Sequence, residues 1–357
     1  MNTSFLTLLL FVFCFVPQNP DHFRSQTAMT LWFILAMIAF KLKDKLHWSA
    51  ALMFLLCSIS AANITFSKHP PFMHLGIMNV IAMDGATAQS LLWLLVVTLF
   101  LVLTSIDVLK KLERGFGVAI FISSLMMLYH YFFTSIPPVG ILDNHAIDAT
   151  FVAVAIPSMY NRPLFNKYLY LFFPIMAVLV AKSNTGIMLL SFQLVCYLLA
   201  KKKKIPVAVI CGAGVFLLAY KYFLGWKFLD DNGRYVIWRW AYEYWVGSGK
   251  LLFGLGSGTY QLLGPIMQQA HQHIIYFIWM HNEFLQVLFE QGIVGLIIAI
   301  MTFGFALKTA KKPYLKLSLG TIFMACFTQF PFRMMPICLF CAIILKLAFR
   351  DNASGRA

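Results

Sequence analysis

Apolar residues fill most of this chain in long runs that short polar and basic stretches separate. A helix that crosses a bilayer needs about 20 mostly apolar residues. By this criterion the pattern predicts about twelve spans, with a re-entrant or interfacial segment at 67–85 around Pro70 and Pro71. The expected spans are 3–17, 27–41, 47–66, 86–107, 115–135, 146–160, 165–181, 184–200, 205–223, 282–307, 317–330 and 334–349. The sequence therefore predicts an all-α polytopic membrane protein, with residues 1–357 as one integral membrane domain.

The composition agrees with a membrane protein. The chain is 61% hydrophobic and only 11% charged, whereas soluble domains carry close to 25% charged residues. A net charge of +15 could indicate a nucleic-acid-binding protein, but the basic residues lie in short clusters between apolar runs. That distribution is typical of membrane proteins, so we expect no nucleic-acid partner. The seven cysteines all fall inside apolar runs and are expected to be buried hydrophobes without a disulfide framework.

The basic clusters predict the orientation. If every expected span crosses, 19 of the 28 Lys and Arg residues fall on one side of the membrane. Those clusters lie at 41–45, 110–114, 162–167, 201–204, 308–316 and 346–356. Short loops rich in Lys and Arg stay in the cytoplasm. Both termini are therefore expected in the cytoplasm of a multi-pass protein, and the long loop at 225–281 faces outward, to the periplasm in a Gram-negative cell.

The long loop is dense in tryptophan and tyrosine, which favour the headgroup layer. Its pattern from Gly233 to Val246 predicts an amphipathic helix in the interface plane, because Arg234, Trp238, Ala241 and Trp245 recur on one face. At headgroup depth Arg234 would either bind phosphate bidentately or extend to lipid headgroups. Arg239 points elsewhere on this helix; it is a candidate substrate contact, and a contact with headgroups is the favoured alternative.

A glycine-rich stretch, Gly254-Leu255-Gly256-Ser257-Gly258, follows in the loop. Such a stretch can present backbone N–H groups to an anion. A plain turn is the favoured alternative, and the sequence is not a Walker A motif because no Gly-Lys-Ser/Thr follows.

Three histidines, His271, His273 and His281, come next. We expect no metal, because the loop has no cysteine and its carboxylates lack motif spacing. His281, where the loop meets a span, is a candidate general base or a donor that orients an acceptor hydroxyl. Glu283 is expected to face away from it. Glu290 is a carboxylate about 13 Å along the helix, so we expect it to pair with polar groups in the bundle rather than with His281.

These pieces together resemble the O-antigen ligase and polymerase superfamily. The residues that carry the resemblance are Gly233-Arg234 with Trp238, Gly254-x-Gly256-x-Gly258, His281-Asn282-Glu283 and Glu290-x-Gly292-x-x-Gly295. The resemblance is concentrated in residues 233–297. Its members are polytopic bacterial glycosyltransferases that use undecaprenyl-pyrophosphate-linked sugars. It implies transfer on the periplasmic face of the bacterial inner membrane, without a nucleotide sugar, a cofactor or a metal.

The resemblance also implies roles for single residues. His281 matches the family's essential histidine, which activates or orients the acceptor hydroxyl, and Asn282 beside it is a candidate substrate contact. Arg234 matches the loop arginine that holds the donor pyrophosphate as leaving group. Because charge develops on that leaving group, a fixed arginine stabilises the transition state.

Two upstream segments fit the same family. Asp143-Asn144-His145-Ala146 resembles an Asn-rich turn before a span, so Asn144 and His145 are candidate substrate contacts. Lys182-Ser183-Asn184 lies where the family often has Ser-Arg, with Asn184 at the arginine position. Either Lys182 supplies the second positive charge, as a point charge and not a fork, or it is an interfacial anchor.

Ligation of a preassembled glycan to lipid A–core is the favoured function. Polymerisation, in which another repeat unit is the acceptor, and transfer to a protein such as pilin use the same donor and stay open. The expected partners are the lipid-linked glycan, a lipid A–core or glycan acceptor, and membrane lipids. A transporter or flippase is the alternative of a different class. It would need ionisable residues at mid-membrane, for which Asp148 and Glu290 are the candidates, and internal repeats, which we do not find.

Overall fold

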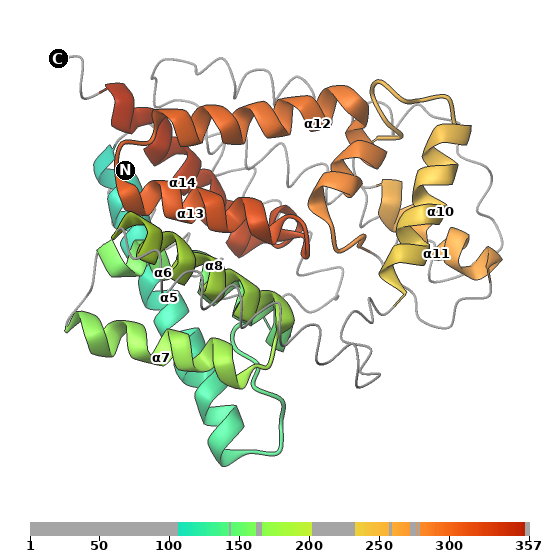
Figure 1. Cartoon of the computed structure of the whole chain (residues 1–357). Coiled ribbons are helices and arrows are strands. Elements are labelled where there is room, and N and C mark those ends of the chain that lie inside the picture. The colour runs from blue at the N-terminus through green and yellow to red at the C-terminus, as the bar shows by residue number, and fades with distance from the viewer. Residues whose placement is uncertain are drawn as a thin grey trace, which may run out of the picture.

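The computed structural model describes residues 106–142, 144–161, 166–201, 233–256, 259–271, 277 and 279–353. This part of the chain is 79% helix and contains no strand, which confirms the all-α fold class for it. The helices are α5 (Ile106–Phe133), α6 (His145–Asn161), α7 (Lys167–Val180), α8 (Asn184–Ala200), α10 (Arg234–Gly247), α11 (Thr259–Ala270), α12 (Glu283–Thr309), α13 (Pro313–Ala325), the 3-10 turn η1 (Pro331–Arg333) and α14 (Met335–Ala353). Figure 1 shows their arrangement.

Helices α5 to α8 and α12 to α14 pack into one bundle around α6. Every residue of α6 from Asp148 to Met159 is buried, so this helix is enclosed on all sides. Hydrogen bonds fix the directions of its neighbours. Ser123 of α5 binds Asp148 at the start of α6, and Glu113 binds Ser158 near its end, so the two helices are antiparallel. Gln193 of α8 donates to the carbonyl of Ala153 at 2.6 Å and to Thr321 of α13 at 3.3 Å.

Helices α10 and α11 form a smaller cluster beside the first turns of α12, at one side of the molecule in Figure 1. The buried face of α10 consists of Ile237, Ala241 and Trp245, which pack with Tyr260, Leu263, Met280 and Phe289. The helix expected from Gly233 to Val246 is therefore confirmed, with Trp238, Ala241 and Trp245 on its inner side. Gly233 begins it in the left-handed region, at φ 81°.

Helix α12 is broken at Gly292, whose φ of 69° and ψ of −168° are not helical. The break leaves backbone carbonyl and N–H groups of α12 without partners inside the helix, and a neighbouring turn forms hydrogen bonds with them. Leu255 and Gly256 donate to the carbonyls of Phe289 and Glu290, at 3.0 and 2.8 Å. Ile293 and Val294, beyond the break, donate to the carbonyls of Leu251 and Leu252, at 3.0 and 3.1 Å. The 251–256 turn thus completes the hydrogen bonding of the broken helix.

Most of the expected helix positions that fall in the described part agree with the structure within a few residues, and two need correction. The residues between the expected spans 86–107 and 115–135 are helical, because α5 already begins at Ile106; Lys, Arg and Leu are good helix formers outside a bilayer too. The expected span 317–330 is α13, Pro313–Ala325, which starts earlier because Pro313 suits a first helical turn. The spans expected before residue 86, most of 86–107 and the span 205–223 lie outside the described residues.

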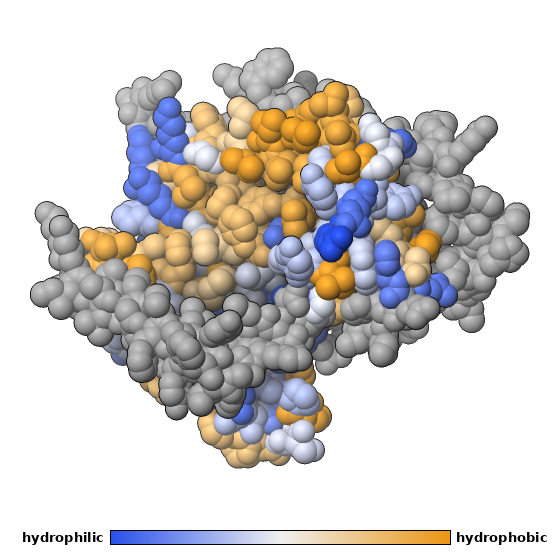
Figure 2. Space-filling model, turned by 45° about the vertical axis from the view of Figure 1, so that its right-hand side comes forward, coloured by the Kyte–Doolittle hydropathy of each residue, from blue (hydrophilic) through white to orange (hydrophobic). Residues whose placement is uncertain are grey.

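Two described helical segments, Leu112–Phe133 and Glu283–Thr309, are long and apolar enough to cross a membrane. On α12 the large exposed side chains include Ile293, Ile297 and Ile300, which recur along one face at helical spacing. The face drawn in Figure 2 is largely orange over the described residues, and its hydrophilic residues gather in separate blue groups. An exposed apolar surface of this kind suits contact with lipid.

Candidate functional site

The two residues expected to carry the chemistry, Arg234 and His281, come together in the structure. Arg234 is the first residue of α10, and His281 lies two residues before α12. The Arg234 guanidinium donates to the carbonyl of Thr328 at 3.5 Å, just beyond the end of α13. Its charge also acts on His281, whose side chain is hydrogen-bonded to Gln329. Segments far apart in the sequence therefore meet at one site.

Aromatic rings surround the His281 imidazole. The rings of Phe330 and Phe277 meet it edge to face, with centroids 4.9 and 5.5 Å away. Phe330 stacks in turn on Trp279 at 5.5 Å. Burial among these rings, and to a smaller extent the positive charge of Arg234, lowers the pKa of His281 to about 4. The imidazole is therefore neutral at neutral pH, and its Nδ1 has no hydrogen-bond partner among the described residues.

The backbone of His281 is in the left-handed region, with φ of 53°. Among the described residues only Lys182, with φ of 51°, shares this property without being a glycine. A strained residue of this kind costs about 1–3 kcal/mol and persists where its surroundings hold it. Both residues come directly before a helix N-cap, Asn282 for α12 and Ser183 for α8. Strain thus occurs at two of the residues that the sequence singled out.

The start of α8 reaches the same site. The Gln329 amide, which contacts His281, also donates to the Thr185 hydroxyl at 3.5 Å. Ser183 caps the helix by accepting from Gly186, and Lys182 is exposed three residues before Thr185. Gly186 packs against Ala149 in the first turns of α6. The N-termini of α6 and α8 therefore lie at the same end of the bundle as His281.

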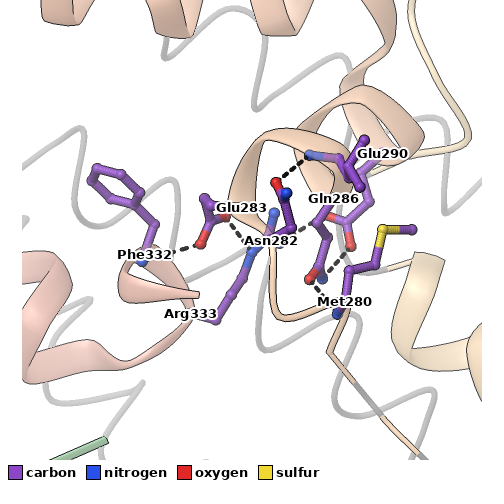
Figure 3. Close-up of polar contacts among 8 residues, drawn as sticks. Met280, Asn282, Glu283, Gln286, Glu290, Phe332 and Arg333 are labelled. Atoms are coloured by element: carbon purple, nitrogen blue, oxygen red, sulfur yellow. Dashed lines mark hydrogen bonds and ion pairs between the residues drawn. The ribbon is translucent and has the colours of Figure 1, made fainter. Parts of the chain in front are cut away.

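A buried ion-pair network supports the start of α12 (Figure 3). Arg333 donates to Glu283 at 2.8 Å and to Glu290 at 2.7 Å, and all three side chains are almost fully buried. Gln286 donates to the other oxygen of Glu290 at 3.0 Å. The expectation that Glu290 pairs within the bundle is confirmed. Glu283 pairs with Arg333 as well and also accepts from the Phe332 N–H at 3.2 Å.

The glycine-rich stretch is a turn in the part that the structure describes. The N–H groups of Gly254, Leu255 and Gly256 all donate to backbone carbonyls, those of Lys250, Phe289 and Glu290. Donors used in this way are not available to an anion. The sequence left open an anion-binding loop or a plain turn, and these three residues form a plain turn. Ser257 and Gly258 lie outside the described part.

The contacts of the remaining candidates Arg239 and Asn144 are with their own helices. Arg239 is exposed on α10 and forms an ion pair with Glu243 at 2.8 Å. Asn144 caps α6 by accepting from Ala146 and Ile147 at 3.0 and 3.2 Å, and His145 beside it is exposed. Asp148 is fully buried and accepts from the backbone N–H groups of Gly140 and Leu142, so it holds the preceding loop in place.

Sequence reasoning missed Thr328, Gln329 and the partnership of Arg333 with two carboxylates. Thr328 and Gln329 were placed inside an expected span, because a short polar pair did not interrupt the apolar pattern. Arg333 was counted only as an outward basic residue. The available signal was a glutamine and an arginine flanking a Phe-Pro-Phe turn between two apolar runs, which is unusual within a membrane segment.

The sequence matches no protein-family model, and no curated protein sequence is significantly similar to it. The functional conclusion therefore depends on the arrangement of the site residues.

Proposed function

We propose that this protein is a membrane glycosyltransferase of the O-antigen ligase type. It transfers a glycan from an undecaprenyl-pyrophosphate donor to an acceptor hydroxyl on the periplasmic face of the bacterial inner membrane, with lipid A–core as the acceptor. The observation that carries the proposal is the meeting of Arg234 with a neutral, half-buried His281 at one end of the bundle. A fixed guanidinium and an unprotonated imidazole are the two groups that such a transfer needs.

The reaction is a displacement at the anomeric carbon of the donor sugar. The acceptor oxygen forms the new bond to that carbon, and the bond from the carbon to the pyrophosphate oxygen breaks. The pyrophosphate leaves with the electron pair and is stabilised by Arg234. The hydroxyl proton passes to His281, which is free to take it because its imidazole is neutral.

The low pKa of His281, about 4, is a property of the protein without substrate. A bound pyrophosphate brings negative charge next to Arg234. Because the Arg234 charge lowers the pKa of His281, neutralising that charge raises the pKa again. In this proposal His281 becomes a stronger base only when the donor is bound, and orients the acceptor hydroxyl before that.

The arrangement of helix ends supports the proposed orientation. The basic clusters expected in the cytoplasm that fall in described helices lie at the start of α5, the start of α7, the end of α8, the junction of α12 and α13, and the second half of α14. The candidate site lies at the opposite helix ends. We accordingly place both termini in the cytoplasm and the site at the periplasm.

The two carboxylates on which a transporter would depend have structural partners. Asp148 binds the loop before α6, and Glu290 binds Arg333 and Gln286. These contacts favour the enzyme over the transporter, because a mobile coupling site needs groups that can exchange partners.

The proposal is tested by gene deletion and complementation, with surface polysaccharide separated on gels. We expect deletion to leave long polymer on undecaprenyl pyrophosphate and none on lipid A. Single repeat units on lipid A, without longer chains, would instead identify a polymerase. His281→Ala and Arg234→Ala should each lower transfer by on the order of 10²- to 10⁴-fold.

His271→Ala is the matched control, because His271 is exposed and stacks on Trp240, with ring centroids 4.1 Å apart. It should complement as well as the wild type. Full activity of both His281→Ala and Arg234→Ala, at normal protein levels in the membrane, would falsify the catalytic assignment.

A further inference from the structure

The strained backbone of His281 is held through the residue before it. The Trp238 indole N–H of α10 donates to the Met280 carbonyl at 2.5 Å. The Met280 N–H donates to the Gln286 amide oxygen at 3.2 Å. Met280 and Gln286 are both buried, at 2% and 0% exposure. Both polar groups of one peptide residue are therefore fixed by side chains from two different helices.

The residues after His281 are fixed as well. Asn282 accepts from the Leu285 N–H at 3.1 Å, as the N-cap of α12. The Glu283 N–H donates to the Cys326 carbonyl at 2.8 Å, which ties this point to the end of α13. His281 thus lies between two anchored neighbours, and its own φ follows from their positions.

The orientation of the Gln286 amide is determined by the ion-pair network. Glu290 can only accept hydrogen bonds when ionised, so the Gln286 group that faces it must be the NH₂. The amide oxygen is then turned toward the Met280 N–H. Arg333 holds Glu290 from the other side at 2.7 Å, so the sequence of contacts runs from Arg333 to Glu290, Gln286 and Met280 (Figure 3).

We propose that Gln286 and Trp238 are positioning residues for His281, which hold its imidazole at the reacting hydroxyl through Met280. This inference rests on the proposed function, because it assumes that His281 acts in the transfer. In the same proposal the buried Arg333–Glu290 ion pair orients the Gln286 amide, and that amide in turn holds the Met280 N–H.

The test compares two substitutions with two matched controls in the full-length protein. Gln286→Leu removes both amide hydrogen bonds at nearly constant volume, and Trp238→Phe removes the indole N–H but keeps an aromatic ring. Gln291→Leu is the control for the first, since Gln291 is buried in the same helix and its amide nitrogen has no partner among the described residues. Trp240→Phe is the control for the second, since Trp240 stacks on His271.

We expect Gln286→Leu and Trp238→Phe to lower kcat by on the order of 10- to 100-fold, because a displacement of the His281 imidazole by about 1 Å slows the reaction strongly. The donor KM should change by less than about twofold. Neither control should lower kcat by that amount. In a His281→Ala background the same two substitutions should have no further effect on the residual rate, because they act through the missing imidazole.

Each outcome decides a different point. If His281→Ala retains full activity, the proposed function fails. If His281→Ala is inactive while Gln286→Leu and Trp238→Phe match their controls, the function stands and the positioning role is wrong. Multiplicative losses in the His281→Ala background also contradict it, because they indicate a general structural effect. If Gln286→Leu melts well below Gln291→Leu, its loss of activity reflects lower stability. The comparison of Trp238→Phe with Trp240→Phe then decides whether His281 is positioned through Met280.

Discussion

His281 combines backbone strain with an electrostatic environment that keeps its ring neutral. The strain follows from the contacts of Met280, Asn282 and Glu283, whereas the low pKa follows from burial among aromatic rings and from Arg234. The two effects have different origins: the backbone strain costs stability at every pH, whereas the low pKa costs stability only below about pH 6.5. Strained backbones and strongly shifted pKa values are both common at functional sites. Their occurrence together at His281, which the sequence already singled out, supports a functional role for this residue.

The depressed pKa of His281 predicts a dependence of stability on pH. The folded pKa is about 4 and the reference value is 6.5, so between these values the unfolded chain binds a proton that the folded protein does not. The free energy of unfolding is therefore unaffected by His281 above about pH 6.5 and decreases as pH falls toward about 4. His281→Gln removes this contribution. The melting temperature of the wild type relative to His281→Gln should decrease between about pH 7 and pH 4.5 in detergent.

His271→Gln, measured over the same range, controls for loss of an exposed imidazole from the same loop. If the difference between wild type and His281→Gln is independent of pH, His281 is not shielded as the structure indicates.

Helix α12 illustrates what an apolar pattern can and cannot predict. The run from 282 to 307 predicted a helix, and the structure has one at Glu283–Thr309. The break at Gly292 was not predicted, because an apolar run has the same composition on both sides of a break. Its cause is tertiary: the 251–256 turn supplies the donors and acceptors that the broken helix lacks. Gly254 and Gly292 fit because the two backbones approach closely there.

The break predicts that Gly292 is not replaceable. Its φ and ψ belong to a region that only glycine adopts readily, and a Cβ would meet the backbone of Leu252. Gly292→Ala should therefore destabilise the protein by about 1–3 kcal/mol or more. Thermal melting in detergent measures the effect.

The matched control is Gly304→Ala in the same helix, where a Cβ would meet nothing within 4 Å. This change should be neutral or stabilise the protein by about 0.5–1 kcal/mol, because alanine favours the helix. Equal melting temperatures for the two variants would show that α12 is continuous in solution.

At the scale of the whole molecule, the sequence predicted the helices well and their tertiary partners poorly. The positions of α6, α7, α8, α10 and α12 follow from apolar length and from helical periodicity, which are local properties. The pairing of Arg333 with Glu283 and Glu290 joins residues 50 and 43 positions apart, and no local pattern encodes it. Gln329 reached the site for the same reason, since α13 ends at Ala325 and leaves the following residues to turn toward His281.

The two ends of the bundle differ in charge, and this predicts which end faces the cytoplasm. Lys311, Lys312 and Lys316 lie where α12 meets α13, at the end opposite the candidate site. Lys250 is exposed beside α10, on the side of the site. Because basic residues in short loops are retained in the cytoplasm, Lys312 should be cytoplasmic and Lys250 periplasmic.

Cysteine labelling in intact cells tests this orientation. In a background without the seven native cysteines, Lys250→Cys should react with a membrane-impermeant maleimide before the inner membrane is opened. Lys312→Cys should react only afterwards, because the reagent cannot reach the cytoplasm. The reverse result would put His281 and Arg234 on the cytoplasmic side, where a periplasmic acceptor cannot reach them. Labelling of both positions in intact cells would mean that residues 250 and 312 lie on the same side, which contradicts a crossing by α12 between them.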